Sequence, residues 1–253
     1  MSLSTREQAE LERSALEAAE LEISAPSDPR NVARYLNPSA DTVFPLEYSF
    51  HLLGDVSGKR VLDFGCGTGE DAIMLAVRGA RVIGIDISPE LIELARKRAE
   101  VNNVSAEFIV ASAYETGLPA ESIDVVFVHA ILHHLDLERA RREVVRVLKP
   151  GGTLIVQEPV RDSRVMSFLR KLIPYHGQHV SEFEYPLKKE QLDAFCAGMQ
   201  PHSMRRFRLP LVPIIQLVYR RYLRRAYRLD GWLLKTYPRL GRYATVEVRK
   251  VTR

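Results

Sequence analysis

The stretch that decides the fold is residues 61–70, which read VLDFGCGTGE. A β-rich run leads into a loop with glycines at positions 65, 67 and 69, and a helical pattern follows. Glycine adopts positive φ without steric cost and lets a ligand approach the backbone closely. In open α/β sheets such a loop lies at the carboxyl ends of the strands, where nucleotides bind. We therefore expect a nucleotide-binding α/β fold built around this loop.

The remainder of the chain alternates β-rich runs with helical patterns, as α/β folds do. Parallel strands are predicted at residues 60–64, 81–86, 106–110, 123–129 and 153–158, with helices at 70–79, 88–103 and 137–149. A further helix is predicted at 188–198, and two more strands at 203–209 and 244–250. Because parallel strands need right-handed crossovers, this order predicts a doubly wound, mostly parallel seven-stranded sheet.

Composition indicates a globular protein, since 46% of the 253 residues are hydrophobic and 27% are charged. The two cysteines are Cys66 and Cys196, and one of them lies in the glycine loop, so no disulfide framework is expected. The N-terminal residues carry charge throughout, unlike a secretory signal. The most apolar stretch, residues 209–219, holds two prolines and is about half as long as a membrane span. We expect a cytoplasmic location.

Acidic residues around the loop discriminate between cofactors. Glu70 and Asp71 at the helix start would repel a pyrophosphate, but they suit a ligand that carries a positive sulfonium and an ammonium. Asp63 adds a third carboxylate just before the loop. Asp86 ends the second strand, 17 residues after Gly69, where an acid accepts ribose hydroxyls in NAD and S-adenosylmethionine sites alike. The acids after the loop disfavour an NAD(P) oxidoreductase. The simpler alternative is that Asp63 and Asp86 only cap strand ends and that the glycines only make a turn.

Four stretches together resemble the successive motifs of the class I S-adenosylmethionine-dependent methyltransferases, in particular the small-molecule type 11 group. They read VLDFGCGTGE, VIGIDISPELIELARKRA, IDVVFVHAILHHL and REVVRVLKPGGTLIVQEP. The match covers roughly residues 59–159, some two fifths of the chain. The resemblance implies a Rossmann-like methyltransferase fold and S-adenosylmethionine as the cofactor. It also implies that Asp63 and the loop from Gly65 to Gly69 hold the methionine end, and Asp86 the ribose.

The adenine contacts implied by the resemblance lie after the second and third strands. Ile87 would pack on the adenine, and Ser112 would meet its edge. The acid that the family often places near Ser112 is absent, which leaves Ser112 itself or a backbone carbonyl to make that contact. His129 is expected to contact the cofactor through its backbone, and Tyr35 either closes over the cofactor or packs within the domain. The complete set of expected cofactor-binding residues is Tyr35, Asp63, Gly65, Cys66, Gly67, Thr68, Gly69, Asp86, Ile87, Ser112, Ala113 and His129.

The methyl acceptor is expected beside the end of the fourth strand, under a lid. His133 and His134 are candidate general bases, because imidazole titrates near neutrality. Glu158 ends the fifth strand at the same edge and is a third candidate catalytic residue. The alternative for each is a packing or hydrogen-bonding role in the turn. Residues 176–185 hold two histidines and acids without a tight ligand spacing, so no metal site is predicted.

Charge is distributed unevenly along the chain. Residues 1–60 hold 6 Lys/Arg against 10 Asp/Glu, whereas residues 201–253 hold 14 Lys/Arg against 2 Asp/Glu. Within residues 210–242, apolar side chains recur at helical spacing beside arginines, which predicts a basic amphipathic helix. We expect this helix to dock on its own domain. Peripheral contact with an anionic membrane, an oligomer contact and RNA binding are the alternatives.

These patterns predict an S-adenosylmethionine-dependent methyltransferase that acts on a small, partly apolar metabolite, with the oxygen, nitrogen or carbon acceptor left open. Two nucleic-acid chemistries are disfavoured, because the fourth strand is followed by VHAI rather than Asn/Asp-Pro-Pro-Tyr and neither cysteine is placed as a nucleophile for base methylation. The alternatives are an RNA methyltransferase that uses the basic segment and a non-catalytic S-adenosylmethionine-binding protein.

The expected domain organisation is an N-terminal helical cap over residues 1–40 and a methyltransferase domain over residues 41–253. The cap begins with an amphipathic helix whose apolar face holds Leu11, Ala15, Ala18 and Ala19. The methyltransferase domain carries a lid at about 160–187 and a basic helical insertion at about 210–242. The oligomeric state is left open.

Overall fold

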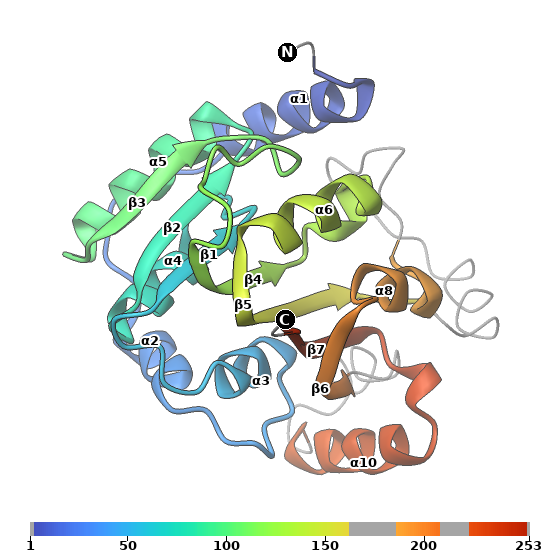
Figure 1. Ribbon diagram of the computed structural model, residues 1–253. Coiled ribbons are helices and arrows are strands. Elements are labelled where there is room, and N and C mark those ends of the chain that lie inside the picture. The colour runs from blue at the N-terminus through green and yellow to red at the C-terminus, as the bar shows by residue number, and fades with distance from the viewer. Residues whose placement is uncertain (1–2, 162–185, 208–222, 252–253) are drawn as a thin grey trace.

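Seven strands form one sheet in the order β3-β2-β1-β4-β5-β7-β6 in the computed structural model (Figure 1). The structure describes residues 3–161, 186–207 and 223–251. Neighbours among β1 to β5 pair in parallel, whereas β7 pairs antiparallel with both β5 and β6. The predicted α/β, mostly parallel seven-stranded sheet is confirmed. The strands are β1 Arg60–Phe64, β2 Arg81–Asp86, β3 Ala106–Val110, β4 Ile123–His129, β5 Leu148–Pro159, β6 Met199–Phe207 and β7 Tyr243–Lys250.

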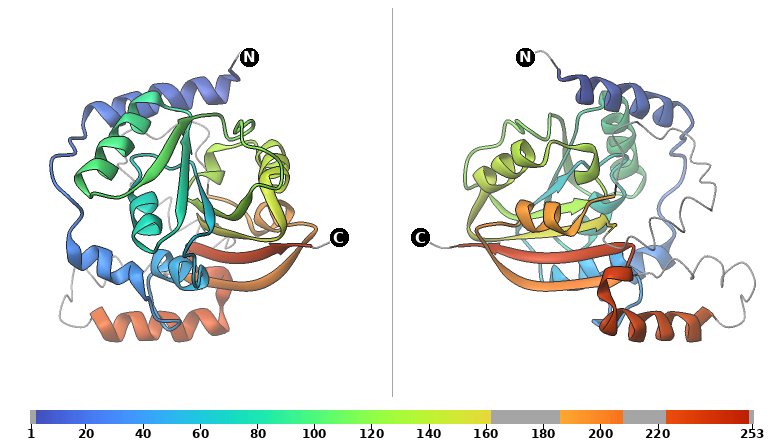
Figure 2. Two further views of the ribbon diagram at one scale, coloured as in Figure 1. Left: turned by 60° about the vertical axis from the view of Figure 1, so that its left-hand side comes forward. Right: turned by 90° about the vertical axis from the view of Figure 1, so that its right-hand side faces the viewer.

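Helices cover both faces of the sheet (Figure 2). Phe127 and Val128 are adjacent on β4 and both fully buried, and their side chains lie in opposite apolar layers. A central parallel strand is buried on both faces in this way. One layer packs α3 (Pro45–Leu52), α4 (Glu70–Val77) and α5 (Pro89–Val101), and the other packs α6 (Leu137–Val147) and α8 (Lys189–Phe195). The other described helices are α1 Thr5–Ala19, α2 Pro29–Leu36, α10 Leu223–Thr236 and the 3-10 turns η1 Leu132–His134 and η3 Pro238–Leu240.

Element boundaries follow local signals in the sequence. Helix α5 begins where predicted, because the Ser88 side chain accepts a hydrogen bond from the Leu91 amide and Pro89 occupies the first helical position. Helix α6 ends at Val147 rather than at the predicted residue 149. The reason is that Leu148 already pairs with Ile123, so β5 begins there and the predicted strand 153–158 is its second half.

Helix α1 docks with a face that the sequence indicated only in part. Leu11 and Ala18 of the predicted apolar face are half-buried, whereas Ala15 and Ala19 are exposed. The buried residues of α1 are instead Glu7 and Ser14, which are 8% and 1% exposed. These two residues are seven apart and therefore lie on one side of the helix. A polar stripe thus faces the domain, and the site described below explains why.

Several predicted features fall wholly or partly outside the described residues. The lid at about 160–187 is described only at its two ends, and the first part of the basic insertion is not described, while α10 forms its later part. The division into an N-terminal cap and a methyltransferase domain stays a prediction. Among the helices that the structure describes, none combines the length and apolar character needed to cross a membrane.

Candidate functional site

A cavity opens at the carboxyl ends of the parallel strands, roofed by α1. Its walls come from the glycine loop after β1, the end of β2, the loop after β3 and the turn after β4. Seven of the predicted site residues line it: Gly65, Gly67, Asp86, Ile87, Ser112, Ala113 and His134. Six of the other thirteen wall residues come from α1, which the sequence analysis did not assign to the site.

The glycine loop is tightly packed at two positions and open at the third. A Cβ on Gly65 would lie 2.6 Å from Cγ1 of Ile131, and one on Gly69 would lie 2.9 Å from Cβ of Ala95. A Cβ on Gly67 would meet nothing within 4 Å, although its φ of +49° also favours glycine. The loop therefore presents bare backbone to the cavity at Gly67, where a ligand can approach closely.

Asp86 joins the loop to the end of β2. Its Oδ2 accepts a hydrogen bond from the Gly67 amide and its Oδ1 accepts one from the Ser88 amide, each at 3.0 Å. Burial raises the pKa of this carboxyl, which is 9% exposed. A carboxylate has about four acceptor positions, so each oxygen keeps capacity for one more donor. The geometry suits a carboxylate that accepts two ribose hydroxyls.

Beside the cavity, carboxylates from β1, α4 and β5 surround one histidine. His129 Nδ1 lies 2.6 Å from Asp71 Oδ2. Burial lowers the pKa of His129, but Asp71 foremost, with Glu158 and Asp63, outweighs it and raises the pKa to about 9. The expected contact of the His129 backbone with the cofactor stays a prediction, and the His129 side chain pairs with Asp71 within this group of acids.

Asp63 is the buried member of that group with unmet bonding capacity. It is 2% exposed, and its Oδ2 has no hydrogen-bond partner. Burial raises its pKa, and the charge of Asp71 raises it further. A buried carboxylate oxygen without a donor is costly, and a cationic ligand group would relieve that cost. This observation fits the sulfonium and ammonium of S-adenosylmethionine better than a pyrophosphate.

Glu158 and His133 form a second polar pair at the end of β5. Glu158 is fully buried, and its Oε1 accepts hydrogen bonds from the Ile131 and Leu132 amides at 2.8 and 2.7 Å. Its Oε2 lies 2.8 Å from His133 Nδ1. One carboxylate therefore fixes both the backbone of the turn after β4 and the ring of His133. The turn is entered through Ala130, which adopts a positive φ of 55°.

Helix α1 adds acidic contacts that the sequence analysis missed. The Ser112 hydroxyl donates to Glu7 Oε1 at 2.7 Å, so an acid from another element of the fold lies beside Ser112. Glu10 Oε2 lies 3.2 Å from His134 Nδ1. Burial raises the pKa of Glu10, but His134 and Arg13 outweigh it and lower the pKa to about 2. The available sequence signal was the run of glutamates on α1, which also fits a solvated face.

The other predicted residues lie outside the cavity lining. Tyr35 packs on Phe50, with ring centroids 5.0 Å apart, which agrees with its packing alternative. Burial raises the pKa of the Cys66 thiol well above its usual range. Thr68 accepts hydrogen bonds from Arg98 through its carbonyl and its hydroxyl. Glu70, whose side chain is 73% exposed, pairs with Arg98 at 3.3 Å and does not line the cavity.

Metal chemistry has no visible basis in the described part of the chain. Over residues 3–161, 186–207 and 223–251, no group of three or more His, Cys, Asp or Glu side chains is arranged to hold a metal ion. The histidines at 176 and 179, which the sequence analysis considered for such a site, lie outside these ranges.

Comparison with known proteins identifies the class. Residues 62–156 match the family model of the methyltransferase domain, Methyltransf_11. A demethylmenaquinone methyltransferase of Thermus thermophilus is 39% identical over 103 residues, which cover 40% of this chain and 47% of that protein. A ubiquinone biosynthesis O-methyltransferase of Xanthomonas oryzae pv. oryzae is 33% identical over 143 residues, covering 52% of this chain and 59% of that protein. The chain thus spans about half the length of the curated relatives it matches.

A solved structure agrees over the whole chain. The geranyl diphosphate C-methyltransferase of Streptomyces coelicolor, in complex with Mg²⁺, geranyl diphosphate and S-adenosyl-L-homocysteine, superposes with a TM-score of 0.65 at 16% identity. The superposition covers 99% of this chain and 100% of that one, and it supports the shared fold. The fold is that of the class I S-adenosylmethionine-dependent methyltransferases. More narrowly, residues 62–156 match the methyltransferase domain of the type 11 group, a family that uses S-adenosylmethionine as its cofactor.

Proposed function

We propose that this chain transfers a methyl group from S-adenosylmethionine to a small, partly apolar metabolite. The observation that carries the proposal is the division of the site into two parts. One is a cavity with Gly67 and Asp86 in its wall, and the other is the acidic group around Asp63 beside it. The names of two relatives, for demethylmenaquinone and for ubiquinone biosynthesis, support a partly apolar acceptor.

Cofactor binding is assigned to residues that the structure brings together. Asp86 would accept the ribose hydroxyls, and Ile87 and Ala113 would enclose the adenine between the ends of β2 and β3. Asp63 would face the cationic methionine end, where its Oδ2 lacks a donor. When bound, S-adenosylmethionine supplies an electrophilic methyl group on a good leaving group. The protein then has to align the acceptor, exclude water and, for many acceptors, remove a proton.

His133 is our candidate for the group that removes this proton. In this proposal His133 Nδ1–H donates a hydrogen bond to the Glu158 carboxylate, which selects the tautomer whose Nε2 can accept a proton. Glu158 is a positioning residue in this account, because it acts through His133 and the turn at Ile131. His134 contacts α1 instead and is assigned to cofactor enclosure.

The test is formation of S-adenosylhomocysteine by the full chain with a panel of quinols, phenols and apolar amines. Replacing the base removes proton transfer, which contributes typically 10²–10⁴-fold. We therefore expect His133→Ala to lower kcat by about 10²-fold or more at unchanged affinity for S-adenosylmethionine. His202→Ala is the matched control, because the His202 side chain is 56% exposed on β6. Equal turnover in both variants would refute the role of His133. S-adenosylmethionine binding with no turnover on any acceptor would favour the non-catalytic alternative.

A further inference from the structure

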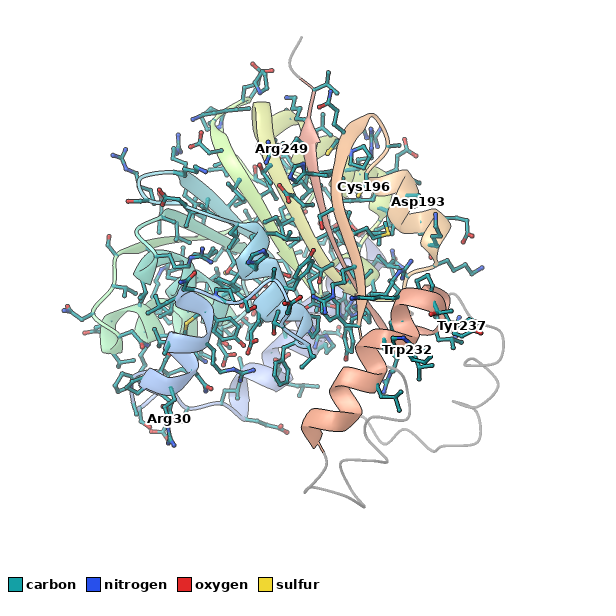
Figure 3. The ribbon with its side chains drawn as sticks, turned by 90° about the horizontal axis from the view of Figure 1, so that it is seen from below. Arg30, Asp193, Cys196, Trp232, Tyr237 and Arg249 are labelled. Carbon is teal, nitrogen blue, oxygen red and sulfur yellow. The ribbon has the colours of Figure 1, made fainter. Side chains whose placement is uncertain are left out.

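Helix α10 carries exposed apolar and aromatic side chains on the outside of the molecule. Leu229, Trp232 and Tyr237 are 53%, 62% and 57% exposed. Leu229 and Trp232 lie about one turn apart in α10, and Tyr237 follows the last residue of the helix. Figure 3 shows Trp232 and Tyr237 projecting from α10 away from the sheet. We call these three residues the α10 surface.

The opposite side of α10 is attached to the domain. Leu234 is 5% exposed, and the helix contacts β6 and η3. In Figure 1, α10 lies at the outer edge of the molecule, below β6 and far from α1. The helix therefore has one anchored side and one side that remains exposed. Large apolar side chains gathered on one exposed face indicate an interaction surface.

The sequence of α10 is basic. The sequence of α10 holds Arg224, Arg225, Arg228 and Lys235 against a single acid, Asp230. It lies within the segment 201–253, where 14 Lys/Arg stand against 2 Asp/Glu. Tryptophan, leucine and tyrosine beside arginine and lysine on one helix are typical of helices that lie in the plane of an anionic membrane.

We propose that the α10 surface docks the protein on an anionic phospholipid membrane, with Leu229 and Trp232 entering the headgroup region. The size of the surface argues against a stable dimer. Three side chains of this kind expose on the order of 400 Å², about half of the ~800 Å² that each partner buries in a standard interface. The exposed aliphatic Leu229 argues for lipid over RNA, because RNA is bound by stacking and hydrogen bonding. The basic residues supply charge complementarity to the anionic headgroups.

The chain contains a direct reporter of this contact. Trp232 is its single tryptophan, so tryptophan fluorescence observes the α10 surface alone. The full chain is mixed with phosphatidylcholine vesicles, or with vesicles of equal parts phosphatidylcholine and phosphatidylglycerol. We expect tryptophan emission to shift to shorter wavelength, and the protein to sediment, only with the anionic vesicles. Added salt should weaken the binding, because the attraction is partly electrostatic.

A pair of variants distinguishes binding through the α10 surface from non-specific adsorption of the protein to vesicles. Replacing Leu229 and Trp232 together with serine should lower vesicle partitioning about tenfold or more, because it removes the buried apolar area. Leu36→Ser is the matched control, since Leu36 is 45% exposed on α2, and it should bind vesicles like the parent. Both variants should keep the parent's thermal midpoint and its affinity for S-adenosylmethionine.

Four outcomes would overturn the proposal. The first is an unchanged emission spectrum with anionic vesicles, and the second is equal binding of neutral vesicles. The third is a shift that depends on protein concentration without lipid, which would indicate self-association. The fourth is a shift with single-stranded RNA but not with vesicles, which would assign the basic segment to nucleic acid.

Discussion

His129 is the residue whose charge state most affects the site. It lies among the carboxylates of Asp71, Glu158 and Asp63, and its pKa is raised to about 9. At neutral pH it is therefore an imidazolium that offsets part of a negative cluster. A ligand with a positive group offsets more of the negative charge of these carboxylates, whereas a pyrophosphate would add negative charge. The site therefore suits a sulfonium cofactor better than a dinucleotide.

The raised pKa of His129 predicts how stability depends on pH. Its ordinary value is 6.5, so the contribution of its charged form is fully present below pH 6.5 and is lost as the pH rises through about 9. Because the ring is 30% exposed and partly screened, we expect the loss to be about 2 kcal/mol of unfolding free energy. His129→Gln should lack this loss. Urea unfolding of the protein without cofactor, at pH 6.5 and at pH 9, measures this loss of unfolding free energy.

The comparison variant for this experiment is His202→Gln, whose side chain is 56% exposed and should leave the pH dependence as in the parent. If His129→Gln and the parent lose the same unfolding free energy between the two pH values, the ion pair with Asp71 does not hold His129 in its charged form.

At the scale of elements, helix α1 shows how the N-terminal segment takes part in the cofactor site. Ser4 caps the helix, and its Glu7 serves both this capping box and Ser112. Glu10 lies against His134 in the turn after β4. The helix thus contacts the loops that follow two different strands. A ligand that enters the cavity from the side of α1 requires the contacts of Glu7 with Ser112 and of Glu10 with His134 to break.

Glu10 offers a specific test of how α1 is held. We expect Glu10→Gln to remove the charged contact with His134 and to make amide protons of α1 exchange about tenfold faster, since a hydrogen bond to a charged group contributes about 1.5–3 kcal/mol. Glu12→Gln, at an exposed position of the same helix, is the control. Hydrogen exchange measured by mass spectrometry reports both. Unchanged exchange in Glu10→Gln would show that α1 is held by other contacts.

The sequence predicted the sheet and part of the site for a physical reason. Strands, helix caps and the glycine loop are local patterns, so Gly67 and Asp86 could be placed from spacing alone. The contact between Glu7 and Ser112 joins residues 105 positions apart. A glutamate on a helix gives no sign of whether it faces solvent or a cavity, and of the predicted apolar face of α1 only Leu11 and Ala18 are half-buried.

Ion pairs in the site were likewise not predictable from the sequence, because they join residues that are far apart in it. His129 and Asp71 are 58 positions apart, and only the folding of α4 against the end of β4 brings them within 2.6 Å. Glu70, adjacent to Asp71, turns to Arg98 instead. Two neighbouring acids that look equivalent in the sequence thus have different roles, because successive positions on a helix point in different directions.

At the scale of the whole molecule, the two proposed functions lie at separate places in the fold. Figure 1 shows α1 and α10 at opposite ends of the fold. The acidic N-terminal part roofs the cofactor cavity, and the basic C-terminal part carries the α10 surface. A protein arranged in this way can rest on a membrane through α10 while α1 remains available to the cofactor.

The central claim is that the cavity binds S-adenosylmethionine, and calorimetric titration of the full chain with S-adenosylmethionine and with NAD tests it most directly. The account predicts saturable binding of S-adenosylmethionine and none of NAD. Asp86→Ala, checked for an intact thermal transition, should weaken binding at least about tenfold, because buried ribose hydroxyls lose their acceptor. Asp41→Asn, at an exposed position, should bind like the parent. Tight binding of NAD with no response to S-adenosylmethionine would contradict the account.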